Sequence, residues 1–191
     1  MTRPRRLSLL LFALLVSATL SACGVHESKG LVRTADTEGT YLDINGLKYQ
    51  VEVSRQMNVY DTQDKPYMVG IPKAQQHLDP DQIWFGVFMR VQNEGSKPLR
   101  PSDDVQISDT QGKVYRPIGL QQVNTYAYRS YDYVPAGQIE PLMDTPGYDT
   151  PARGLMILFK LTLTTLNNRP LVMKIEGRGT PQQTGLIDLD V

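Results

Sequence analysis

The chain has 191 residues, of which 40% are hydrophobic and 21% are charged, as is ordinary for a globular protein of one domain or two small ones. Its net charge is zero, but three arginines precede Cys23 without any acidic residue, so the remainder has 17 basic and 20 acidic residues and a net charge of −3. This weakly acidic remainder excludes a basic footprint for nucleic acid and gives no charge attraction to an anionic membrane.

The first 22 residues have the layout of a secretory signal peptide. Three arginines, Arg3, Arg5 and Arg6, precede an apolar run at residues 9–16, and mostly small residues lead from there to Cys23. The apolar run is shorter than the roughly 20 residues that a transmembrane helix needs. Residues 1–22 are therefore predicted to be a cleaved signal peptide.

The end of this segment, Leu20-Ser21-Ala22-Cys23, resembles the lipobox of bacterial lipoproteins. The resemblance implies cleavage before Cys23, a diacylglycerol on its sulfur, acylation of the new N-terminus, and a location on the extracytoplasmic face of a bacterial membrane. The alternative is an ordinary signal peptide with an incidental cysteine. Gly24 occupies the position at which an aspartate would imply retention in the inner membrane of a bacterium with two membranes. The sequence does not indicate whether the bacterium has one membrane or two. Because Cys23 is the only cysteine, the domain has no disulfide.

Residues 23–40 are polar and without periodicity, and they are predicted to be the lipidated N-terminus and a flexible tether. The folded domain is expected at residues 41–191. It opens with a hairpin around Asn45-Gly46, because both residues of this pair tolerate positive φ and alternating hydrophobic residues flank it. Residues 47, 49, 51 and 53 of its second strand are expected to share one buried face.

Further strands follow with turn residues between them. Residues 82–92 are apolar on both faces, which is typical of a central strand, and residues 105–115 are predicted to form a second hairpin around Asp109-Thr110-Gln111-Gly112. Strands are also expected at residues 155–163, 171–176 and 185–191. Long connections are expected at residues 58–82 and 141–153. Seven or eight short strands without a convincing helical period favour an all-β fold, an antiparallel sandwich.

Three pieces of this pattern resemble the immunoglobulin-like, telokin-like domain of bacterial envelope lipoproteins. They are Trp84-Phe85-Gly86-Val87 with Val91-Gln92-Asn93, the hairpin from Ile107 to Tyr115, and Leu158-Phe159-Lys160-Leu161. The resemblance covers residues 41–191 and implies an extracytoplasmic immunoglobulin-like β-sandwich. It supplies no catalytic residue to transfer.

The residues themselves do not suggest an enzyme, a metal site or a cofactor. His26 and His77 have no nucleophile motif beside them, and one cysteine with two isolated histidines gives no zinc spacing. Two clusters of aspartates, at residues 79–81 and 103–109, do not have the spacing of a calcium-binding loop. They are interpreted as solvated turns, with calcium binding as the alternative. They are Asp79, Asp81, Asp103, Asp104 and Asp109.

The most unusual segment holds four tyrosines within eight residues, Tyr126, Tyr128, Tyr131 and Tyr133. The favoured interpretation is that they cover the core, and the alternative is a binding edge formed with the 141–153 loop, because tyrosines suit sugar stacking and protein interfaces. The leading functional hypothesis is a lipid-anchored, non-enzymatic module that binds an envelope protein or a cell-wall component. The alternatives are a carbohydrate- or small-ligand-binding lipoprotein that uses the tyrosines, and a hydrolase with an unrecognised site.

Overall fold

The structure, a computed structural model, describes residues 31–190. The predicted signal peptide, Cys23 and residues 24–30 of the predicted tether lie outside the described residues. Within the described residues no helix is long and apolar enough to cross a bilayer.

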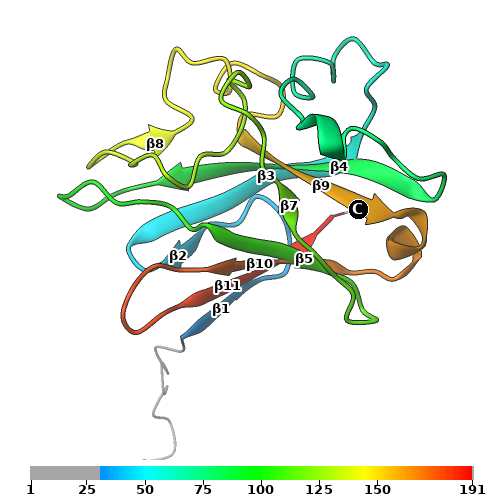
Figure 1. Cartoon of the computed structure of the whole chain (residues 1–191). Helices are drawn as coiled ribbons and strands as arrows, with labels where there is room; N and C mark the ends of the chain where they lie inside the picture. The colour runs from blue at the N-terminus through cyan, green and yellow to red at the C-terminus, as the bar shows by residue number, and fades with distance from the viewer. Residues whose placement is uncertain (1–30, 191) are drawn as a thin grey trace, which may run out of the picture. The chain divides into compact units, whose positions relative to one another are not determined.

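The described residues form eleven strands in two sheets, a β-sandwich (Figure 1). The first sheet has the order β1 (Val32–Ala35), β11 (Thr184–Leu189), β10 (Leu171–Glu176), β5 (Asp104–Ser108) and β6 (Val114–Tyr115). The second has the order β2 (Leu42–Ile44), β3 (Leu47–Met57), β4 (Gln82–Gln92), β9 (Leu155–Thr162) and β7 (Pro117–Ile118), with β8 (Ile139–Glu140) also paired to β4. Two 3₁₀ helices are η2 (Lys73–Gln75) and η3 (Leu163–Asn167). The all-β sandwich predicted from the sequence is confirmed.

The Asn45-Gly46 hairpin forms as predicted. Asn45 has a φ of 50° and Gly46 a φ of 85°, the left-handed values that a two-residue hairpin turn requires at both positions. Ile44 pairs with Leu47, and Leu42 pairs with Tyr49. The turn therefore fixes the register of β2 on β3.

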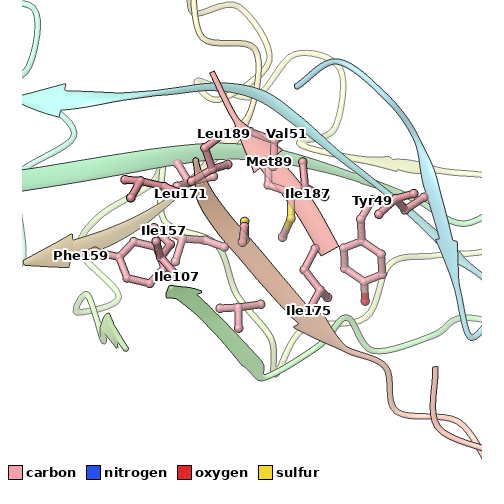
Figure 2. Packing of buried hydrophobic residues seen from close by; sticks show 14 of the residues in the cluster. Tyr49, Val51, Met89, Ile107, Ile157, Phe159, Leu171, Ile175, Ile187 and Leu189 are labelled. Atoms are coloured by element: carbon pink, nitrogen blue, oxygen red, sulfur yellow. The ribbon is translucent and has the colours of Figure 1, made fainter. Parts of the chain in front are cut away.

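The main core lies between the two sheets and comes from alternate residues of the long strands. Ile83, Phe85, Val87, Met89 and Val91 of β4 all point into it. Figure 2 shows side chains of the first sheet, such as Ile107, Leu171 and Ile187, meeting Met89 and Phe159 of the second. The period of two in the sequence therefore places these residues in the core correctly.

The opposite face of the second sheet is also buried, because two long loops cover it. Residues 58–81 and 119–154 lie over β3, β4 and β9 (Figure 1). They bury a second hydrophobic cluster, which we call the loop cluster and which consists of Met57, Tyr67, Met68, Ile71, Trp84, Phe88, Ala152, Met156 and Leu158. This layer explains why the central strand β4 is apolar on both faces.

The structure corrects the predicted boundary between tether and domain. Residues 31–40 were expected in the tether, but Val32–Ala35 form β1, which pairs in parallel with β11 from Val32 opposite Thr184 to Ala35 opposite Ile187. Only Ala35 of this strand is buried. Backbone hydrogen bonding to β11, and not an apolar face, holds the strand, which is why the polar sequence gave no indication of it. All other pairs of strands in the described residues are antiparallel.

Three smaller expectations also differ from the structure. The register of β3 on β4 shifts between Val51 and Val53, so that Val53 leaves the face of Val51 and packs against the loop cluster. Leu163 is exposed instead of continuing the buried face of β9, because the chain turns into η3 there. The described residues form eleven strands, whereas seven or eight were predicted. The additional strands are β1, β7 and β8, and β7 and β8 are each only two residues long.

Candidate functional site

The four tyrosines of the 126–133 segment divide into two packed and two exposed residues. Tyr126 and Tyr128 are partly buried, and each packs against a different hydrophobic cluster. Tyr131 and Tyr133 are 49% and 53% exposed. The first half of the segment therefore covers the core as the favoured interpretation predicts, whereas the rings of its second half are exposed.

Tyr126 belongs to the loop cluster. Its ring centroid lies 4.8 Å from that of Tyr67, and the Tyr67 ring in turn meets Phe88 edge-on at 5.0 Å. Such tilted and edge-to-face contacts are the favoured geometries of aromatic pairs. Tyr126 thus joins the 119–154 loop to the 58–81 loop over the outer face of β4.

Tyr128 closes the end of the main core. Its hydroxyl donates a hydrogen bond to the carbonyl of Ser102 at 2.7 Å, while the Ser102 backbone N–H donates to the hydroxyl of Tyr49 at 2.9 Å. Burial raises the pKa of Tyr49 to about 12, and burial also raises the pKa of Tyr128 well above its ordinary value, with Tyr49 adding to the effect. Both phenols therefore stay protonated donors or acceptors in a structural role.

Two polar side chains fix the path of the segment. The amide of Asn124 donates to the carbonyls of Tyr67 and Val69 at 2.6 and 2.8 Å, and its oxygen accepts from the Tyr126 N–H at 2.8 Å. The Arg129 guanidinium donates to the carbonyls of Leu120, Gln121 and Asn124. These bonds hold residues 120–129 rigidly enough to line a cavity.

Two cavities lie on either side of residues 127–129. We call the first, of about 280 Å³, the Tyr131 cavity; it opens beside β5, β7 and β9, and Val105, Ile118, Met156 and Tyr131 are among its walls. The second, of about 360 Å³, is the Tyr133 cavity. Its walls come from the tyrosine segment, from β8 and from the loop that follows β8, and they include Tyr128, Asp132, Tyr133, Glu140 and Pro146.

The Tyr133 cavity is acidic. Asp132 and Glu140 both line it, and burial, with the charge of Asp132 as a smaller cause, raises the pKa of the Glu140 carboxyl, although a hydrogen bond from the Leu142 N–H opposes the shift. Among the described residues neither carboxylate forms an ion pair with a basic side chain. The cavity therefore presents two carboxylates without an ion-pair partner beside an aromatic ring, and Arg129 is the basic residue of its lining.

The structure thus brings Tyr128 and Tyr133 to one cavity with the loop that follows β8, whereas Tyr131 lines the other cavity and Tyr126 lines neither. Sequence reasoning missed Asp132 and Glu140. A signal for them existed, because residues 130–152 contain four acidic residues and no lysine, arginine or histidine.

Of the other residues considered for chemistry, only Asp103 lines one of these two cavities. The His77 side chain is 86% exposed and lies 3.6 Å from Asp79. Asp103, at the edge of the Tyr131 cavity, pairs with Arg178, and Asp104 pairs with Arg116. Asp109 accepts backbone N–H bonds within its own turn, which lower its pKa against the effect of its burial. Within residues 31–190 no three His, Cys, Asp or Glu side chains are grouped to hold a metal ion.

Comparison with known proteins yields no family. No family model and no curated protein matches the chain. Among solved structures, an uncharacterised β-sandwich protein from Clostridium difficile 630 is similar at 10% identity and a TM-score of 0.47, over 82% of this chain and 95% of that one. The yjhA protein from Bacillus subtilis is similar at 9% identity and a TM-score of 0.46, over 81% and 99%. A functionally unknown protein from Listeria monocytogenes EGD-e is similar at 12% identity and a TM-score of 0.48, over 81% and 83%.

Proposed function

We propose that the protein is a non-enzymatic interaction module that is held by lipid at Cys23 on the extracytoplasmic face of a bacterial membrane and binds another envelope protein or a cell-wall component. The observation that carries the binding role is the Tyr133 cavity, a concave site of 360 Å³ beside exposed tyrosines. This volume falls at the small end of the range for ligand pockets. The resemblance of the chain to telokin-like lipoprotein domains agrees with the proposal.

A protein partner is favoured by the apolar side chains around the cavity. Tyr131 and Tyr133 are about half exposed, and Met143, on the loop that follows β8, is 69% exposed. Tyrosine and methionine are enriched at protein interfaces, where a partner covers their apolar surface. Tyr133 lines the cavity, Tyr131 lines the neighbouring Tyr131 cavity, and Met143 lies on the loop that follows β8. The three side chains therefore offer exposed apolar surface on which a partner protein could rest.

The anchor is supported by the sequence around Cys23 and by the length of the connection. Because the chain is already part of a sheet at Val32, residues 24–31 are all that separate Cys23 from the sandwich, and a chain of this length spans at most roughly 30 Å. A lipid at Cys23 would therefore keep the sandwich near the bilayer and favour partners that also lie close to it. Mass spectrometry of the purified protein tests the anchor: an N-terminal, acylated Cys23 is expected, and an unmodified Cys23 or another cleavage site contradicts it.

The alternative function is a carbohydrate-binding lipoprotein. Its support is the pair of half-exposed rings, Tyr131 and Tyr133, because flat aromatic faces stack on sugars. However, arginines already approach both rings, with Arg129 at 5.9 Å from the Tyr131 centroid and Arg100 at 4.6 Å from that of Tyr133. A rise in melting temperature with peptidoglycan fragments, lost in Tyr131→Ala, would favour this alternative.

Photo-crosslinking in living cells tests the interaction module. A crosslinking amino acid replaces Tyr133, and in a control strain it replaces Tyr60, which is 86% exposed on the other long loop. The proposal expects a discrete protein or cell-wall adduct from position 133 and none of the same identity from position 60. Equal adducts from both positions, or none from positions 131 and 133, would contradict it.

A further inference from the structure

The Tyr133 cavity combines an apolar floor with an acidic rim. Val91 and Val134, both buried, lie at its base together with Pro141 and Leu155. Asp132 is exposed and Glu140 half-buried, and both are part of the lining. A site of this form is complementary to a group with an apolar stem and a positively charged end.

Six carboxylates elsewhere on the sandwich form an ion pair with a lysine or an arginine. The described ion pairs with lysine or arginine are Lys48–Glu94, Arg55–Asp64, Arg90–Glu52, Arg116–Asp104, Lys174–Glu176 and Arg178–Asp103. Asp132 and Glu140 are not in this set, although both line one cavity. The charge of Asp132 there disfavours ionisation of Glu140 and contributes to its raised pKa. The surrounding segment cannot supply the missing cation, since residues 130–152 contain no basic residue.

The two arginines nearest the cavity are engaged elsewhere. Arg129 lines the wall, but its guanidinium donates to the carbonyls of Leu120, Gln121 and Asn124. Arg100 lies with its guanidinium carbon 4.6 Å from the centroid of the Tyr133 ring, in a cation–π contact. Neither forms an ion pair with Asp132 or Glu140 in the described residues, so both carboxylates can still accept hydrogen bonds from a basic group of a partner.

We propose that the Tyr133 cavity receives a basic side chain, lysine or arginine, from a partner polypeptide. This inference rests on the proposed function and names the chemistry that the partner must present. The methylene stem of the side chain would lie against Leu155 and Pro146, and its charged end would meet the carboxylates of Asp132 and Glu140. A charge-assisted bond to a carboxylate is roughly twice as strong as a neutral one, and the partly buried setting screens it less than open water does.

The size of the cavity is sufficient for one side chain of a partner. Its 360 Å³ is at the lower limit of the roughly 300–1,000 Å³ that drug-sized ligands occupy. Binding hot spots typically consist of one anchor residue, often arginine, that fills a pocket with a ring of other contacts around it. The exposed Tyr133, which lines the cavity, would be one of these surrounding contacts.

The first experiment uses defined probes on the full-length, fluorotyrosine-labelled protein in detergent micelles. N-acetyl-lysine methylamide and N-acetyl-arginine methylamide are titrated while the fluorine resonance of Tyr133, assigned through Tyr133→Phe, is followed. The neutral control probe is N-acetyl-norleucine methylamide, which has the same stem without the charge. We expect saturable shifts with the two basic probes and at least tenfold weaker binding for the norleucine probe.

Variants of the carboxylates complete the test. Asp132→Asn with Glu140→Gln keeps the size of both side chains and should weaken binding of the basic probes at least tenfold. Asp104→Asn removes a carboxylate that is paired with Arg116 outside the cavity and should leave binding unchanged. Equal binding of the norleucine probe, unchanged binding by the double variant, or no saturable shift with either basic probe would overturn the inference.

In-cell crosslinking separates failure of this inference from failure of the proposed function. A crosslinker at position 133 is combined with the Asp132→Asn, Glu140→Gln double variant. Loss of the adduct in the double variant supports the inference. An adduct of unchanged yield overturns the inference while the interaction module stands, whereas the absence of any adduct from the parent protein argues against the module itself.

Discussion

The two buried faces of the second sheet are held in different ways. The face toward β5, β10 and β11 meets another sheet, and its cluster is built from regularly alternating strand residues such as Phe159 and Met173. The face toward the loops meets irregular backbone, which supplies Tyr67, Met68, Ile71 and Ala152 to the cluster. Polar side chains, above all Asn124 and Arg129, fasten that backbone.

This difference shows where the protein can vary without losing its fold. Burial of apolar area between sheets is non-directional, and its stabilisation is spread over many residues. A loop layer has backbone groups that no strand pairs, so its stability depends on a few side-chain hydrogen bonds. Because both cavities lie along the loop layer, we expect the binding surface to open locally before the sandwich unfolds.

The largest expected effect comes from the face between the sheets. Phe159 of β9 is fully buried there, so Phe159→Ala should lower the free energy of unfolding by about 3–5 kcal/mol, from lost apolar burial and the cavity left behind. Denaturant unfolding followed by circular dichroism measures it. Leu163→Ala, at an exposed position beyond the same strand, is the control and should change the value by less than about 0.5 kcal/mol. Similar losses in both variants would show that the sheet face is not the main core.

A smaller and more local effect is expected at the fastening of the loops. Asn124→Ala would leave the carbonyls of Tyr67 and Val69 and the N–H of Tyr126 without their partner, at a cost of about 2–3 kcal/mol. Hydrogen exchange should accelerate at residues 67–70 and 124–129 while β10 keeps its protection. The control is Gln122→Ala at an exposed position, which should change neither the free energy of unfolding nor the exchange rates. Uniform acceleration in both sheets would contradict a separately held loop layer.

The close approach of the second long loop to β4 gives the next prediction. A Cβ added at Gly154 would lie 2.8 Å from the Met89 nitrogen and 2.9 Å from the Phe88 carbonyl carbon. Both contacts are with backbone that cannot move aside, so Gly154→Ala should cost about 1–2 kcal/mol through local overpacking. Gly119 has nothing within 4 Å of such a Cβ, and Gly119→Ala should be tolerated. Thermal unfolding of the two variants compares them, and equal melting temperatures would show that the loop is free to shift.

The sequence predicts the core between the sheets better than the loop layer, because strand residues alternate regularly and loop residues do not. Alternation with a period of two marks the residues of β4, β9 and β10 that face the other sheet, and Asn45-Gly46 specifies a hairpin through local backbone geometry. β1 could not be predicted from its side chains, because only Ala35 is buried and its partner β11 is far away in the sequence. The bulge between Val51 and Val53 depends on the partner strand in the same way.

The candidate site was predictable only in part. The spacing of the tyrosines identifies the segment. Which cluster each ring packs against depends on where the chain crosses the sheet, and the bridge between Ala127 and Met156 fixes that crossing. Tyr126 therefore joins the loop cluster and Tyr128 joins the main core, although both have the same parity in the sequence. Asp132 and Glu140 are ordinary loop residues until β8 pairs with β4 and brings Glu140 to the cavity.

The smallest expected effect on stability, Glu140→Gln, distinguishes the binding surface from the rest of the loop layer. Burial and, to a lesser degree, Asp132 raise the pKa of Glu140 above its ordinary value of 4.5, so the folded state binds the proton more tightly than the unfolded state. The free energy of unfolding should therefore fall as pH rises from 4.5 through the raised pKa, and this loss should be absent in Glu140→Gln. Burial also raises the pKa of Glu38, so the difference between the pH profiles of parent and variant isolates Glu140.

Above the raised pKa, Glu140→Gln should be at least as stable as the parent protein, because the variant no longer buries a charge beside Asp132. Urea unfolding between pH 4 and pH 8 measures this, with Glu94→Gln, which removes an exposed carboxylate from the Lys48 pair, as the control. A variant that is less stable than the parent at neutral pH would mean that the hydrogen bond from the Leu142 N–H and other contacts within the chain outweigh the cost of burying the Glu140 charge. A variant that is equally or more stable, yet loses the basic probes, would show that this carboxylate is retained for binding at the expense of stability.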